Sequence, residues 1–203
     1  MKILKQTDLD EAAKLLQEGK VIAFPTETVY GLGVIYDSKE AYDALVSVKR
    51  RPPDKPFTLM LADLEDVEKY AVLNKVSKAL VNNFMPGQFT MITKAQPGLP
   101  AWCVSNIGNV GIRIADYDLI RDLIRKTGKP LLVPSANKSG EQPGTTAKEV
   151  VDAFGDELAA VIDGKTVSNV PSTIVLVEEK YTQVFREGAI KIEDIKRVVS
   201  KEK

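Results

Sequence analysis

The stretch Val21-Ile-Ala-Phe-Pro-Thr-Glu-Thr-Val-Tyr-Gly-Leu-Gly33 decides the fold. Its first four residues are all apolar, which predicts a short buried strand over 21–24. Hydroxyls, a carboxylate and two glycines follow, which predicts a polar loop from Pro25 to Gly33. Because ligands of open α/β sheets lie outside the carboxyl ends of strands, this order favours a binding loop. A turn held by local hydroxyl hydrogen bonds explains the same residues.

Apolar periodicity on both sides of this stretch continues the alternation of strands and helices. Residues 9–17 have helical spacing, and Ser38 can cap a helix over 40–48 that Pro52 and Pro53 stop near Lys49. Further strands are predicted over 57–61, 89–93, 109–114, 130–133, 158–162, 172–177 and 181–185, and helices over 64–71, 76–84, 117–127, 147–154 and 192–199. No linker interrupts the pattern, so we expect one α/β domain over 1–203, a mixed sheet covered by helices.

Composition excludes several kinds of chemistry. Lys plus Arg and Asp plus Glu each number 28, so no overall field attracts a polyanion. The chain has no histidine, which removes the commonest general base and metal ligand. A single cysteine, Cys103, and the lack of an apolar run of about 18 residues lead us to expect a cytoplasmic protein that does not enter a membrane.

A second polar segment, Lys49-Arg-Arg-Pro-Pro-Asp-Lys-Pro56, places four cations within seven residues. Two adjacent prolines keep its backbone extended, and a stiff basic segment suits phosphate. Arg offers a planar fork for phosphate oxygens, whereas Lys acts as a point charge. A solvated surface connection explains the same run of charges.

A third polar segment, Pro134-Ser-Ala-Asn-Lys-Ser-Gly-Glu-Gln-Pro-Gly144, follows a predicted strand and precedes a helix that Thr145 or Thr146 can cap. It lacks the Gly-Lys-Ser/Thr order of a Walker A loop. Its backbone N–H groups could still hold phosphate, although an ordinary capped loop is the alternative. Arg113, which lies in a mostly apolar strand, needs a charged partner or a ligand.

Six segments occur in the order that is typical of the YrdC/YciO family, which the chain resembles from Ala12 to Gly188. They are Pro-Thr-Glu-Thr-Val-Tyr-Gly-Leu-Gly, Lys-x-Arg-Pro, Pro-Gly-x-x-Thr, Val-Gly-Ile-Arg, Pro-Ser-Ala-Asn and Ser-Thr-Ile. The resemblance implies a twisted mixed β-sheet with flanking helices and a large concave cavity. The biosynthetic members of this family are L-threonylcarbamoyladenylate synthases.

The resemblance also implies a function. Such an enzyme is a nucleotidyltransferase that makes threonylcarbamoyl-AMP and pyrophosphate from L-threonine, bicarbonate or CO2, and ATP with Mg²⁺. The product serves the threonylcarbamoyladenosine modification of tRNA, which the protein would meet directly or through a downstream transferase. We expect a monomer or weak homodimer.

Family residues map onto this sequence by the same resemblance. The catalytic tetrad falls on Lys49, Arg51, Ser135 and Asn137. The threonine pocket would contain Thr26, Arg113 and Ser172. The nucleotide side would add Gly144, Thr145 and Arg186 to the tetrad, and no protein ligand for a metal is expected. Threonine carbamate can attack the α-phosphate directly, so a chain without histidine suffices.

Two other functions fit the sequence. One is a YciO-like module that binds tRNA or double-stranded RNA without this activity. The other keeps the fold and changes the substrate, as a carbamoyl transferase module or a ligase for another amino acid. The segment Phe57-Thr-Leu-Met-Leu-Ala62 is closer to the YciO branch, since some synthases have a threonine-binding histidine there.

Overall fold

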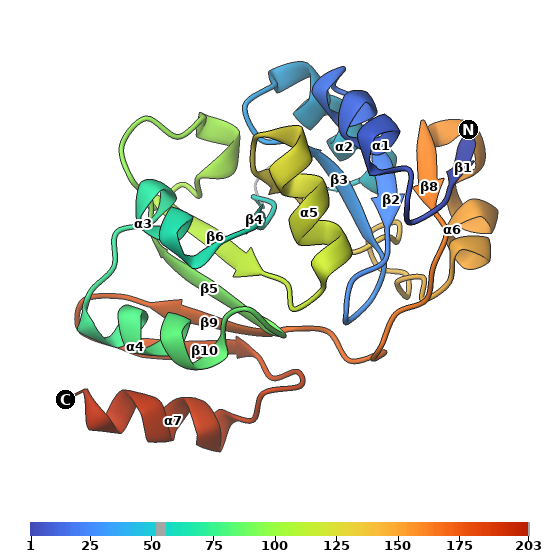
Figure 1. Cartoon of the computed structure of the whole chain (residues 1–203). Helices are drawn as coiled ribbons and strands as arrows, with labels where there is room; N and C mark the ends of the chain where they lie inside the picture. The colour runs from blue at the N-terminus through green and yellow to red at the C-terminus, as the bar shows by residue number, and fades with distance from the viewer. Residues whose placement is uncertain (52–55, 203) are drawn as a thin grey trace.

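The computed structural model describes residues 1–51 and 56–202. Within these ranges ten strands form one sheet, in the order β1-β8-β2-β3-β7-β4-β6-β5-β9-β10 (Figure 1). The strands are β1 Lys2–Leu4, β2 Ile22–Phe24, β3 Gly31–Ile35, β4 Leu59–Leu61, β5 Phe89–Lys94, β6 Asn109–Ile114, β7 Leu131–Leu132, β8 Ala160–Ile162, β9 Thr173–Val177 and β10 Thr182–Arg186. Parallel and antiparallel neighbours are mixed, which confirms the predicted fold class.

Helices flank the sheet in two groups. In Figure 1, α1 and α5 lie side by side near β2 and β3, whereas α4 and α7 lie beside the β9–β10 end. The helices are α1 Leu9–Gln17, α2 Lys39–Lys49, α3 Val67–Tyr70, α4 Lys75–Phe84, α5 Asp118–Thr127, α6 Ala147–Phe154 and α7 Ile192–Lys201, with short 3-10 turns η1 Leu64–Asp66, η2 Ala101–Cys103 and η3 Gly155–Glu157. No helix in the described part of the chain combines the length and apolarity that crossing a membrane requires.

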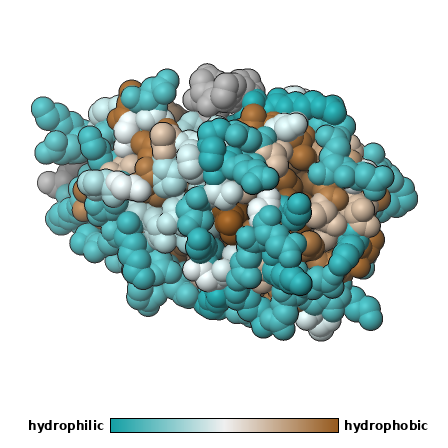
Figure 2. All heavy atoms as spheres, turned by 90° about the horizontal axis from the view of Figure 1, so that it is seen from above, coloured by the Kyte–Doolittle hydropathy of each residue, from teal (hydrophilic) through white to brown (hydrophobic). Residues whose placement is uncertain are grey.

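The core lies between the sheet and these helices. Its largest fully enclosed side chains include Phe24, Tyr30 and Phe89. Seen from above, the outer surface is mainly hydrophilic, with apolar side chains showing between the polar ones (Figure 2). Burial of this apolar area is the main stabilising contribution to the fold.

Helix α2 ends at Lys49, the first of two candidate residues in the basic segment. The Ser38 hydroxyl accepts a hydrogen bond from the Ala41 backbone N–H at 3.2 Å, as the sequence predicts. The helix ends at Lys49, and Arg50 takes a left-handed conformation with φ 50°. This reversal sends Lys49 and Arg51 in different directions.

The strand β3 corrects one prediction. The polar loop was predicted to reach Gly33, but a strand already begins at Gly31, and residues 31–33 pair antiparallel with β2. A Cβ on Gly33 would overlap Phe24 Cε1 and lie 2.9 Å from Cζ, and one on Gly31 would lie 3.2 Å from Cε2. Gly33 therefore leaves room for the ring of Phe24, which is a packing role. Gly31 leaves room for this ring and for Val133, whose Cγ1 a Cβ would meet at 2.7 Å, and it also lines a cavity, in keeping with the predicted approach to a ligand.

Gly33→Ala is expected to lower the free energy of unfolding by about 1–3 kcal/mol, because the added methyl collides with a ring that cannot move in the core. Gly111→Ala in β6 is the matched control, since its Cβ would meet its nearest neighbour, Thr58 Oγ1, at 3.7 Å. Urea unfolding followed by circular dichroism measures both changes. Equal destabilisation by the two alanines would contradict the packing role of Gly33.

Candidate functional site

A cavity of about 350 Å³ opens where the predicted polar segments meet. Small-molecule sites in proteins commonly have volumes of about 300–1,000 Å³. The described lining residues lie within 26–31, 56–60, 133–143 and 171–174, together with Arg51, Thr90, Arg113 and Arg186. The fold thus brings the three segments to one place, as predicted.

Tyr30 joins the first of these segments to the third and to the end of β8. Its backbone N–H donates to Gly144 O at 2.9 Å, and its carbonyl accepts from Ala136 N at 2.7 Å. Its phenol donates to the carbonyls of Gly164 and Ile162, at 2.8 and 3.0 Å. Burial, together with the nearby charge of Asp163, raises the pKa of the Tyr30 hydroxyl, so it remains a donor at neutral pH.

Three members of the predicted tetrad are in contact. Lys49 Nζ donates to Ser135 O at 2.6 Å and to Asn137 Oδ1 at 2.7 Å. The Ser135 hydroxyl also donates to Asn137 Oδ1, at 2.6 Å, and Asn137 Nδ2 donates to the carbonyls of Lys138 and Glu141. Ser135 and Asn137 are among the described residues that line the cavity, whereas Lys49 is not and is 3% exposed. Lys49 therefore supports the cavity wall from behind.

The position of Lys49 changes its acid–base behaviour. Burial, with a smaller contribution from the positive charge of Arg51, lowers the pKa of its ammonium group to about 7. The hydrogen bonds from the ammonium group to Ser135 O and Asn137 Oδ1 favour its charged form and so act to raise the pKa. At neutral pH the group is thus poised between its charged and neutral forms.

This position predicts a pH dependence of stability. Between pH 7 and 10.5 the unfolded chain keeps a proton on Lys49 that the folded chain releases, so the free energy of unfolding should rise with pH. The slope would reach at most about 1.4 kcal/mol per pH unit. Lys49→Met removes the titrating group and should lose this rise, which urea unfolding of both proteins at several pH values measures. Parallel pH profiles of the two proteins would contradict the burial of a titrating ammonium.

The remaining cations of the basic segment separate. Arg51 lines the cavity, donates from Nη2 to Pro56 O at 3.1 Å, and holds its guanidinium 5.0 Å from the centre of the Phe57 ring. Arg50 instead lies 3.6 Å from Glu157 Oε1 at the surface. The predicted extended backbone at Pro52 and Pro53 lies outside the described residues.

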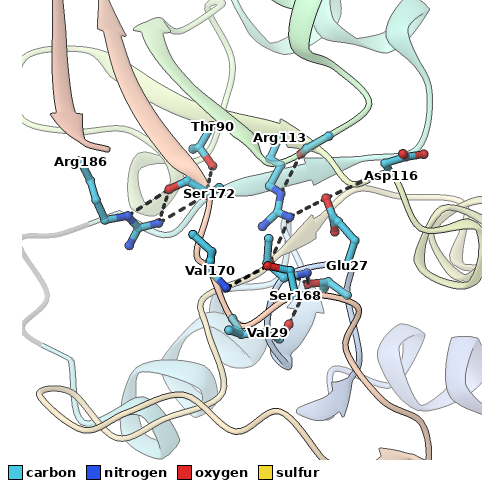
Figure 3. A network of polar contacts seen from close by, with 12 residues as sticks. Glu27, Val29, Thr90, Arg113, Asp116, Ser168, Val170, Ser172 and Arg186 are labelled. Carbon is cyan, nitrogen blue, oxygen red and sulfur yellow. Dashed lines mark hydrogen bonds and ion pairs between the residues drawn. The ribbon is translucent and has the colours of Figure 1, made fainter. Parts of the chain in front are cut away.

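Arg113 has an internal partner that sequence reasoning missed. Its Nη2 lies 2.7 Å from Glu27 Oε1 and donates to Thr28 Oγ1 at 3.2 Å, while Nε donates to Gly87 O at 3.4 Å (Figure 3). The Asp116 backbone N–H donates to the same oxygen of Glu27, at 3.2 Å. The prediction that Arg113 needs a partner is confirmed. The available signal was a lone carboxylate in a loop that was otherwise rich in hydroxyls.

Thr26 serves both of the roles proposed for its loop. Its hydroxyl donates to Val29 O at 2.7 Å and lies 3.0 Å from Thr28 Oγ1, so the local turn is confirmed. The same side chain lines the cavity, as expected for a binding residue.

Ser172 and Arg186 form a second polar cluster on the cavity wall (Figure 3). Arg186 donates to Ser172 O from Nε at 3.0 Å and from Nη2 at 2.8 Å. The Ser172 hydroxyl lies 2.9 Å from Thr90 Oγ1, a lining residue and the threonine of the Pro-Gly-x-x-Thr segment, to which the sequence assigned no role. A register shift in β10 between Val184 and Arg186 accompanies this turn of the arginine toward the cavity.

Two predicted nucleotide-side residues lie elsewhere. Gly144 and Thr145 are absent from the described cavity lining. The Gly144 N–H donates to Ala136 O at 3.0 Å, and Thr145 donates to Glu149 Oε2 from its backbone and its hydroxyl. Thr146, rather than Thr145, caps α6. Contact of Gly144 and Thr145 with a nucleotide stays a prediction.

Arginines, hydroxyls and an amide thus converge on one cavity beside a mixed α/β sheet. This is an α/β protein with a cavity whose lining suits anionic small molecules. The model of the Sua5/YciO/YrdC family, described as "Telomere recombination", matches residues 14–188. The chain belongs to this family, which confirms the resemblance seen in the sequence.

Relatives of this chain carry informative names. It is 35% identical over 192 residues to threonylcarbamoyl-AMP synthase of Bacillus subtilis, covering 93% of this chain and 56% of that protein. It is 34% identical over 185 residues to threonylcarbamoyl-AMP synthase of Vibrio campbellii, covering 89% of this chain and 99% of that protein. The chain therefore spans about half of the longer relative and nearly all of the shorter one.

Solved structures agree with the fold. The crystal structure of Pyrococcus abyssi Sua5 complexed with L-threonine superposes with a TM-score of 0.92 at 29% identity, over 98% of this chain and 61% of that one. Escherichia coli YciO superposes with a TM-score of 0.88 at 23% identity, over 96% and 98% of the two chains. The second likeness shows the fold alone.

Proposed function

We propose that this protein synthesises threonylcarbamoyl-AMP from L-threonine, bicarbonate or CO2, and ATP, with release of pyrophosphate. The observation that carries the proposal is the meeting of Arg51, Arg113 and Arg186 with the Lys49–Ser135–Asn137 cluster around one cavity. Relatives named threonylcarbamoyl-AMP synthase and the threonine complex of Pyrococcus abyssi Sua5 support it.

The cavity divides between the two organic substrates in this proposal. Arg113 would bind the threonine carboxylate, with the hydroxyl of Thr26 beside it. Ser172, which accepts hydrogen bonds from Arg186, would line the threonine pocket where it meets the phosphates. Arg51 and Arg186 would neutralise phosphate oxygens of ATP. Ser135 and Asn137 would orient the reacting groups, while Lys49 acts through them from behind.

The proposed reaction needs no covalent intermediate with the protein. The carbamate of threonine attacks the α-phosphorus of ATP, and the bond to the pyrophosphate oxygen breaks. Positioning and stabilisation of the charge that develops on the phosphates are the main contributions of a protein to such a step. Fixed guanidinium groups and hydrogen-bond donors supply both.

Mg²⁺ enters the proposal as the ion that accompanies ATP. Within residues 1–51 and 56–202 no group of three or more His, Cys, Asp or Glu is placed to hold a metal. This suits an ion bound mainly by phosphate oxygens and water, which is usual for Mg²⁺ with nucleotides. Transfer of the product to tRNA, a cytoplasmic location and a monomer or weak homodimer stay predictions.

The proposal is tested by incubating the pure protein with ATP, bicarbonate and Mg²⁺, with and without L-threonine. Pyrophosphate release that depends on threonine is expected, with threonylcarbamoyl-AMP identified by mass. The Bacillus subtilis synthase in the same buffer is the positive control. If the control is active and this protein releases no threonine-dependent pyrophosphate, the proposed reaction is wrong.

A further inference from the structure

The two members of the Glu27–Arg113 ion pair are placed differently relative to the cavity. Arg113 lines the cavity, whereas Glu27 is absent from the described lining. Both side chains are buried, with 9% of Arg113 and 7% of Glu27 exposed. Glu27 therefore lies behind the guanidinium as seen from the cavity. It contacts Arg113, and Arg113 is the residue of the pair that a ligand in the cavity would meet (Figure 3).

The charge of Glu27 is directed at Arg113. Oε1 receives Arg113 Nη2 at 2.7 Å and the Asp116 backbone N–H at 3.2 Å. Oε2 is enclosed, and no donor in the described part of the chain reaches it. A buried carboxylate oxygen without a donor is costly, so the charge of the carboxylate is offset chiefly by the neighbouring guanidinium. In return, Glu27 offsets much of the charge that Arg113 presents to the cavity.

Arg186 has different surroundings. It donates to the carbonyl and hydroxyl oxygens of Ser172, which carry no charge. Its positive charge is thus available to a ligand. The cavity contains one arginine that is paired with a carboxylate and another that is held by neutral oxygens.

We propose that Glu27 determines ligand specificity at the Arg113 end of the cavity. A guanidinium that is already paired with a carboxylate still directs N–H donors at a monoanionic carboxylate, but it attracts a multiply charged phosphate far less. Glu27 thereby reserves Arg113 for the carboxylate of an amino acid and leaves phosphates to the Arg186 end. This inference rests on the proposed function, which places both kinds of anion in one cavity.

The first experiment uses the unmodified protein. Calorimetric titration with L-threonine is performed with and without inorganic phosphate in excess. We expect phosphate to leave the Kd for threonine within about twofold, because Arg113 disfavours it. Competition of phosphate with threonine in the unmodified protein would overturn the inference. Complete lack of threonine binding would instead argue against the proposed function. The role of Glu27 would then be tested by comparing the phosphate affinities of the unmodified protein and of Glu27→Gln.

The second experiment compares variants. Glu27→Gln keeps the side-chain shape but removes the charge, and it should bind inorganic phosphate about tenfold more tightly, in competition with threonine. Glu27→Asp keeps the charge and should retain rejection of phosphate. Asp116→Asn is the matched control, because this exposed neighbour contacts Glu27 only through its backbone.

A purely structural role for Glu27 would change stability without changing anion selection. Unchanged phosphate affinity in folded Glu27→Gln would therefore overturn the inference. If that variant does not fold, the competition experiment on the unmodified protein decides alone.

Discussion

Arg113→Gln is expected to abolish threonine-dependent pyrophosphate release and to lower the free energy of unfolding by about 3–5 kcal/mol. The loss of activity follows from loss of the guanidinium at the threonine end of the cavity. The loss of stability has another cause. Glu27, only 5% exposed, would keep a buried charge whose partner at 2.7 Å is gone.

The double variant Glu27→Gln/Arg113→Gln separates these two effects. It leaves two neutral amides in place of two charges, so most of the lost stability should return while activity stays absent. Urea unfolding and the pyrophosphate assay give the two readings. A double variant as unstable as Arg113→Gln alone would show that the ion pair is not what holds these segments together.

Asn137→Ala should reduce activity about 100-fold, because displacement of reacting groups by even 1 Å can cost that much. The amide holds Lys49 and Ser135 through Oδ1 and the carbonyls of Lys138 and Glu141 through Nδ2. Its removal leaves a buried ammonium without one acceptor and two carbonyls without donors. We therefore expect stability to fall by about 2–3 kcal/mol.

Asn83→Ala is the control for this change. Asn83 lies exposed on α4 and donates to the Ala79 carbonyl at 2.8 Å, so the same truncation removes only a surface hydrogen bond. Its effect on stability should stay within about 0.5 kcal/mol. Comparable loss of activity in both variants would mean that the Asn137 amide has no special part in the site.

The larger pattern of the fold could be predicted from the sequence. Apolar periodicity located the helices 9–17 and 147–154, and the predicted cap Thr146 marks the start of the second, since both signals are local. The strand β3 was missed because Gly31 and Gly33 are typical of turns, and their close contacts with Phe24 and Val133 involve residues outside the strand. The short β1 likewise depends on its partner, β8.

Site geometry was harder to predict, because it depends on contacts between distant segments. The order of motifs pointed to Lys49 and Arg51 as neighbours in function, but a single left-handed residue, Arg50, sends one behind the cavity wall and the other onto it. Glu27 and Arg113 each stand out in the sequence as a lone charge in its own segment, but nothing local shows that the two segments meet.

The strand order also affects when contacts can form during synthesis, because β2 lies between β3, which follows it closely in the chain, and β8, which is made much later. A ribosome delivers the segment around Tyr30 early, whereas the carbonyl of Gly164 that receives its phenol emerges much later. Contacts between such distant segments form slowly, because a long loop must close first. The lining residues Ser172 and Arg186 emerge later still. We expect the nascent chain to remain unable to bind substrate until Arg186 has been synthesised, so ligands would protect the finished protein and give no help to its early folding intermediates.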